Sequence, residues 1–222
     1  MSSTTPLLDR HPVEAVITGI GDRLKDVRDV PVYALDTATT KALLVEMARV
    51  KAQLAELETR ILAHGQTLQV EHDTAAASTA TWWAHQTRQT KSAAHRTARL
   101  AAALATERRE PVRVALADGD LLPDQAEAII AAIDALPEDL DPDIVEAAQA
   151  HLIRLAAEFD AKHLRVLGRR ILEVVAPEIG EAHEAELLAR QEREADQAAS
   201  LRMSDDGHGK TYGRFTLPTW VA

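Results

Sequence analysis

The sequence contains no cysteine, which excludes disulfide bonds, thiolate zinc sites, iron–sulfur clusters and cysteine nucleophiles. It also lacks a run of about 18 apolar residues, so it predicts no membrane span. The N-terminal segment lacks the basic start and apolar stretch of a signal peptide. We therefore expect a cytoplasmic protein with no membrane partner.

Aromatic residues are scarce, at 3% of 222 residues, although hydrophobic residues make up 46% of the chain. Most of the apolar content is Ala and Leu, and the chain is also rich in Glu and Arg, a composition that favours helices. An all-β fold is therefore excluded. We expect a mainly α fold, a multi-helix bundle with enough length for a substantial core.

The clearest single element is a long helix over about 37–64. Asp36 or Thr37 is placed to cap its start, and Gly65 to end it. Six large apolar residues follow one another at alternating steps of four and three, as in the a and d positions of a heptad: Leu43, Met47, Val50, Leu54, Leu57 and Ile61. The stripe must be covered by another helix of this chain or by a second copy, and the sequence leaves both open.

The remaining patterns divide the chain into a flexible tail (1–11), a helical domain (12–200) and a β-hairpin (201–222). We interpret the hairpin as the start of a truncated C-terminal region, because two strands alone are marginally stable. Within the helical domain, apolar periodicity, turn residues and prolines predict further helices at about 12–28, 80–90, 93–110, 112–136 (two helices around Gly119), 143–158, 160–175 and 178–200.

The charges are unevenly distributed. The segment 117–160 carries twelve acidic side chains and one basic one, whereas 82–113 carries two acidic and seven basic ones: Arg88, Lys91, Arg96, Arg99, Arg108, Arg109 and Arg113. The basic block could bind a polyanion such as DNA. Alternatively, the two blocks could neutralise one another in the folded protein.

The segment 80–104 is similar to a helix–turn–helix unit, whose second helix would carry Lys91, Arg96 and Arg99. These are residue types that contact phosphates and base edges, which favours DNA contact. Trp82 and Trp83 could stack on a base. The competing interpretation is that both tryptophans fill the core of an Ala-rich bundle.

No pattern indicates catalysis or a cofactor. The sequence has no nucleophile elbow, phosphate-binding loop or dinucleotide fingerprint. None of its nine histidines has the spacing of a paired metal ligand on one helix face. We therefore predict no catalytic residue, no metal ligand and no cofactor, and we expect the chain not to be an enzyme.

Several short motifs, in this order, resemble the domain-of-unknown-function family 222, which occurs at the N-terminus of actinobacterial HNH endonuclease-like repeat proteins. They are Trp83 with the Ala/Arg helix after it, the turn Ala115–Gly119, Gln125-Ala126 with Ile129-Ile130, the stretch Leu164–Gly168, and the Arg202–Gly213 hairpin. The resemblance implies a non-catalytic, DNA-associated accessory module. The alternative is a protein-interaction or oligomerisation scaffold with no nucleic-acid role. In either case the stripe of helix 37–64 could bind a second copy or a nuclease partner. This sequence carries no recognisable HNH segment, so no catalytic residue is carried over.

Overall fold

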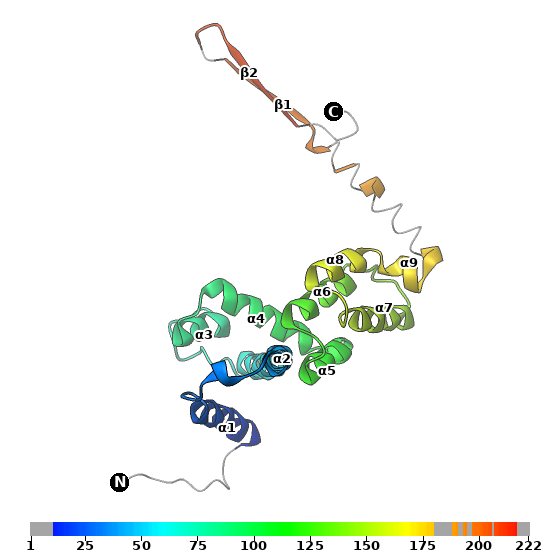
Figure 1. The fold of residues 1–222 in the computed structure, drawn as a ribbon. Coiled ribbons are helices and arrows are strands. Elements are labelled where there is room, and N and C mark those ends of the chain that lie inside the picture. The colour runs from blue at the N-terminus through cyan, green and yellow to red at the C-terminus, as the bar shows by residue number, and fades with distance from the viewer. Residues whose placement is uncertain (1–10, 180–187, 191–192, 195–196, 206, 217–222) are drawn as a thin grey trace. The chain divides into compact units, whose positions relative to one another are not determined.

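The fold is mainly α-helical with one two-stranded β-hairpin, as the composition predicts (Figure 1). The computed structural model describes residues 11–179, 188–190, 193–194, 197–205 and 207–216. The chain forms two compact units, Met1–Glu46 and Met47–Ala222, and the boundary between them falls inside a long helix.

The first unit contains helix α1 (Pro12–Asp26), a 3-10 turn (Val32–Ala34) and the start of helix α2. Helix α1 confirms the helix expected at about 12–28, and Pro12 stands in its first turn, where a missing N–H is harmless. No side chain of α1 is buried. Its apolar residues, among them Val16, Ile17 and Leu24, are exposed.

Helix α2 (Thr37–Leu68) confirms the long helix and its start, where the Asp36 carboxylate accepts a hydrogen bond from the Thr39 N–H at 2.7 Å. This bond lowers the pKa of Asp36. The predicted end at Gly65 is wrong. The helix continues to Leu68, and the left-handed residue after it is Gln69, with φ 50°. Glycine and asparagine are the usual residues in a left-handed position after a helix, so the sequence favoured Gly65 over Gln69 as the end of α2.

Helices α3 (Thr79–Thr87) and α4 (Lys91–Leu104) form the expected helix pair. Hydroxyls cap both helices: Ser78 accepts from the Thr81 N–H and Thr90 from the Ala93 N–H. Between them, Arg88 takes a left-handed conformation with φ 58° and reverses the chain.

Helix α4 ends at Leu104, not at the predicted Glu110. A 3-10 turn (Glu107–Arg109) follows, and Glu110 begins the next helix, α5 (Glu110–Asp118). Pro111 therefore lies in the first turn of a helix instead of terminating one, since a first-turn residue needs no N–H donor.

Gly119 closes α5 and begins the turn to α6 (Pro123–Asp134), as the sequence predicts. Its φ is 77°, and a Cβ at this position would lie 3.0 Å from the Arg49 carbonyl oxygen of α2. Both conditions favour glycine. The turn therefore approaches the α2 backbone closely, and the Gln53 amide donates to the Asp118 carbonyl at 3.4 Å.

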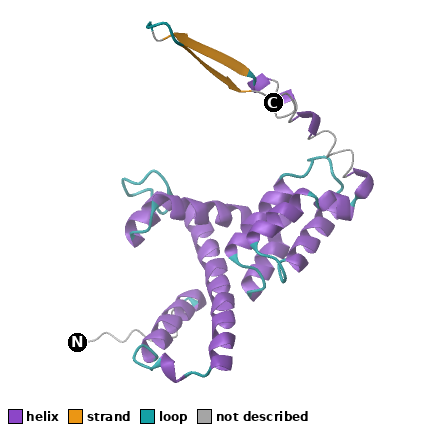
Figure 2. Ribbon diagram, turned by 45° about the horizontal axis from the view of Figure 1, so that its top comes forward, coloured by secondary structure: helices purple, strands orange, loops and turns teal. Residues whose placement is uncertain are grey.

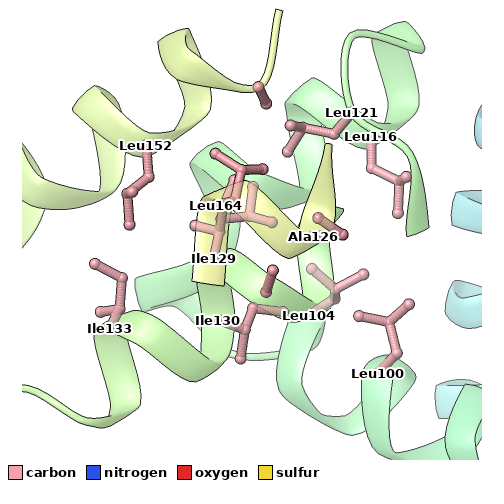
Figure 3. Close-up of a cluster of buried hydrophobic side chains, with 14 of the residues drawn as sticks. Leu100, Leu104, Leu116, Leu121, Ala126, Ile129, Ile130, Ile133, Leu152 and Leu164 are labelled. Atoms are coloured by element: carbon pink, nitrogen blue, oxygen red, sulfur yellow. The ribbon is translucent and has the colours of Figure 1, made fainter. Parts of the chain in front are cut away.

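Helices α7 (Pro142–Leu155), α8 (Ala161–Arg169) and α9 (Ile171–Val175) complete the bundle. The single helix expected at 160–175 is thus two helices that meet at Arg170. Helices α6 and α8 lie side by side (Figure 1). The main core is formed by side chains of the helices from α4 through α9. Its fully buried side chains include those of Leu116, Ile129, Leu152 and Leu164 (Figure 3).

A buried glutamine ties the start of α6 to the end of α7. The Gln125 side-chain oxygen accepts from the Leu122 N–H at 2.8 Å, and its amide donates to the carbonyls of Ala156 (2.9 Å) and Phe159 (2.8 Å). Both the oxygen and the nitrogen of the Gln125 amide therefore have hydrogen-bond partners inside the protein.

The predicted hairpin is confirmed as strands β1 (Ser200–Asp205) and β2 (Thr211–Thr216), which pair antiparallel with Met203 opposite Gly213 (orange in Figure 2). Most of the helix expected at 178–200 lies outside the described residues. Among the described helices, none combines the length and the apolar character needed to cross a bilayer.

Candidate functional site

Glu56, on α2, is the centre of a buried ion-pair network. It is only 2% exposed and accepts hydrogen bonds from Arg60 Nε at 3.2 Å and from Arg113 Nη1 at 3.0 Å. Arg113 also pairs with Glu110, and the two carboxylates raise the pKa of Arg113. Arg113, one of the seven basic residues predicted to contact DNA, therefore links α5 to α2.

Arg109, which the sequence predicts as a nucleic-acid contact, is a buried residue and not a surface one. It is 4% exposed, and its guanidinium donates to Gln149 Oε1 at 3.3 Å and to the Asp134 carboxylate. A buried guanidinium needs such partners because desolvation of an unpaired charge is costly. The carboxylate of Asp134 belongs to the acid-rich segment 117–160, so this pair is one case in which the acidic and basic segments neutralise one another.

Arg96, on α4, pairs with Glu127, on α6, with 2.7 Å between Nε and Oε1. The hydrogen bond raises the pKa of Arg96. Arg96 and Arg99 line one hollow of about 340 Å³ together with Glu127 and Asp134. The two arginines therefore face carboxylates as well as solvent, which weakens their attraction for a polyanion.

The other four predicted cations, Arg88, Lys91, Arg99 and Arg108, are exposed, and within the described residues no ion pair holds them. Arg108 lines a hollow with four acidic side chains: Glu107, Glu110, Glu138 and Glu146. Arg88 and Lys91 flank the α3–α4 turn. The structure thus divides the seven basic residues among several surroundings and does not gather them on one face.

The heptad stripe of α2 faces away from the rest of its unit. The side chains that α2 buries are Ala52, Glu56, Thr59 and Leu62. At 100° per residue these lie on the side of the helix opposite to Met47, Val50, Leu54 and Ile61. Those four stripe residues are between 36 and 50% exposed. Among the described residues of the second unit, no helix covers these four side chains fully.

The two tryptophans have different environments. Trp83 packs against the small cluster of Leu62, Ala80, Ala98 and Ala101, as a core residue does. Trp82 lines a cavity of about 450 Å³ beside the α3–α4 turn. Adjacent residues on a helix point about 100° apart, which is why the two indoles separate. The core-filling interpretation therefore holds for Trp83, whereas base stacking by Trp82 stays a prediction.

Among the described residues, no three His, Asp or Glu side chains come together as a metal site would require. The closest pairing is His163 with Asp160, where the carboxylate caps α8 and also contacts Nδ1 at 2.9 Å. These bonds lower the pKa of Asp160. Their arrangement is that of a helix cap.

These features define a mainly α-helical module with an exposed heptad stripe and a tryptophan-lined cavity. The model of the family described as "Domain of unknown function (DUF222)" matches residues 41–211, and the chain belongs to this family. The match confirms the resemblance seen in the sequence motifs. No curated protein and no solved structure matches the chain.

Proposed function

We propose that this chain is a non-catalytic helical scaffold that associates with a second copy of itself through α2. The observation that supports the proposal is the exposed stripe, in which Met47, Val50, Leu54 and Ile61 face away from the side of α2 that the chain buries. Heptad stripes of this kind are typically covered by another helix with the same repeat.

The charges beside the stripe match those of a second, antiparallel α2. If Leu54 of one copy meets Leu57 of the other, Val50 meets Ile61 in the neighbouring layer. In this register Lys51, which is exposed, lies beside the exposed Glu58 of the second copy, and the twofold axis repeats the pair. Flanking pairs of opposite charge favour one partner and one orientation.

The stripe is tested with Leu54→Asp, measured by sedimentation velocity over a range of protein concentrations. Each copy would place a carboxylate in the apolar seam and lose a large aliphatic contact. Because burying one such side chain stabilises by about 1.5–3 kcal/mol, we expect the dissociation constant to rise at least ~100-fold for the two sites. Val114→Asp, a matched change at an exposed valine of α5, should leave it unchanged.

The orientation is tested by charge exchange. Lys51→Glu should weaken association, and Lys51→Glu combined with Glu58→Lys should restore it, because the pair is reversed and not lost. A wild-type chain that stays monomeric at all concentrations would overturn the proposal. Restoration is not expected in a parallel pair, since these two positions would then not meet.

DNA association is the second candidate function, supported by the helix pair α3–α4 with Lys91 and Arg99 exposed on its second helix. It predicts weak binding of duplex DNA that falls steeply with salt. Lys91→Glu with Arg99→Glu should abolish gel retardation, and Arg165→Glu, an exposed change on α8, should not. Equal retardation of all three proteins would rule out this face.

A further inference from the structure

The cavity beside the α3–α4 turn has the chemical features of a small-molecule site. Its volume of about 450 Å³ lies in the range of ligand pockets. Helix α3 contributes Trp82, His85 and Gln86, the turn and the start of α4 contribute Gln89 and Lys91, and three alanines supply an apolar surface. Such a combination of apolar wall and few polar groups is usual for a ligand site.

The lining contains no carboxylate. Its ionisable groups are Lys91 and His85, although acidic residues outnumber basic ones by 35 to 25 in the chain. The two hollows described above are each lined by at least two carboxylates. An anion would therefore be attracted to the Trp82 cavity and repelled from the hollow at Arg108, where four glutamates surround one arginine. In the hollow at Arg96 and Arg99 the two arginines and two carboxylates balance one another.

The polar groups are available to a ligand. Thr90 caps α4, so Lys91 begins the helix and its ammonium makes no hydrogen bond or ion pair with another described residue. The Gln89 amide nitrogen donates to Thr87 Oγ1 at 2.9 Å, which leaves its carbonyl oxygen to accept from a ligand. Glutamine amides suit the hydrogen-bonding edges of nucleobases, and an indole face stacks on any base.

We infer that this cavity binds one nucleotide, with the base against Trp82, the base edge at Gln86 and Gln89, and the phosphate at Lys91. The nucleotide could be free or part of a single-stranded nucleic acid, and the chemistry is the same in both. Paired bases inside a duplex are inaccessible to such stacking. The site is independent of the α2 stripe, so it stands or fails separately from self-association.

Tryptophan fluorescence of the full chain tests the site. Three probes are titrated into the protein: deoxyadenosine monophosphate, a single-stranded deoxyadenosine hexamer, and a GC-rich DNA hairpin whose stem stays fully paired at the assay temperature. We expect quenching by at least one of the first two and weak or no quenching by the duplex. Quenching by the hexamer alone identifies a single strand as the ligand, and quenching by the mononucleotide identifies a free nucleotide.

Three variants locate the binding. Lys91→Glu is an exposed change that removes no contact within the described residues, and it should weaken binding at least tenfold and flatten its salt dependence. Trp82→Leu should abolish the quenching, whereas Trp83→Phe, which removes the packed indole, should preserve it. Circular dichroism melts establish that each variant is folded.

The outcomes against the inference are equally definite. Absence of quenching and of calorimetric heat for both single-stranded probes at millimolar concentration would overturn it. Binding that Lys91→Glu leaves unchanged would also overturn it. Duplex binding as strong as hexamer binding would assign the nucleic-acid contact to the outer face of α4 and not to this cavity.

Discussion

Gly168→Ala tests the packing of α8 on α6 most directly. A Cβ at Gly168 would lie 2.4 Å from the Ala132 Cβ of α6. Carbon atoms in contact are normally about 3.5–4.0 Å apart, so the two helices must separate by roughly 1 Å. They cannot do so freely, because Leu164 and Ile129 are fully buried in the same core.

Two opposing effects set the magnitude. Alanine is a better helix former than glycine by about 1 kcal/mol, which would stabilise α8. Overpacking of a core costs about 1–3 kcal/mol, and the 2.4 Å approach belongs at the upper end of that range. We therefore expect Gly168→Ala to lower the free energy of unfolding by about 1–2 kcal/mol.

Urea denaturation followed by circular dichroism measures the change, and a double-mutant cycle assigns its cause. Gly168→Ala combined with Ala132→Gly moves the methyl group from α6 to α8 and removes the clash. The double variant should therefore be more stable than the sum of the single changes predicts, with a coupling of about 1–3 kcal/mol. A Gly168→Ala protein as stable as wild type, or purely additive effects, would refute the packing argument.

Three further predictions concern stability. Gly65→Ala should stabilise by about 0.5–1 kcal/mol in urea denaturation, because Gly65 lies inside α2 and its nearest contact would be an ordinary 3.6 Å; a glycine that ended the helix would give destabilisation instead. Asp134→Ala should cost about 2 kcal/mol by the same assay, since it leaves the Arg109 guanidinium buried with only a neutral partner; the control Glu127→Ala, which frees the exposed Arg96, should cost less than about 1 kcal/mol. The lowered pKa of Asp160 stabilises the folded state at neutral pH, and this contribution is lost as the pH falls below about 4; Asp160→Asn keeps a capping oxygen but does not titrate, so the difference in melting temperature between the two proteins should shrink between pH 6 and pH 3, and a constant difference would contradict this.

Local signals gave most of the helices. The start of α2 at Asp36 and the Gly119 turn each depend on a few neighbouring residues, and each is found where the sequence predicts it. The boundary between α4 and α5 was predicted wrongly because one local signal there fits two structures. Pro111 fits both the end of one helix and the first turn of the next, and only the packing of α5 against its neighbours decides between them.

The candidate sites depended on residues far apart in the chain. The sequence placed Arg109 in a basic block, but its burial depends on Asp134 and Gln149, which lie 25 and 40 residues away. The buried Glu56 carried one local signal, the arginine four residues later, yet its second partner Arg113 lies 57 residues away. The cavity at Trp82 likewise requires α3, the loop before it and the start of α4 together.

The amino-acid sequence by itself determined that this chain is helical, where most helices begin, and that α2 carries a heptad stripe, because these follow from hydrogen bonding and periodicity within a few turns. Only the tertiary structure decided which face of α2 is buried, which arginines stay in solvent and which tryptophan lines a cavity. Those outcomes depend on how distant helices pack, since a charge or an apolar face is neutralised or covered only by what the fold brings beside it.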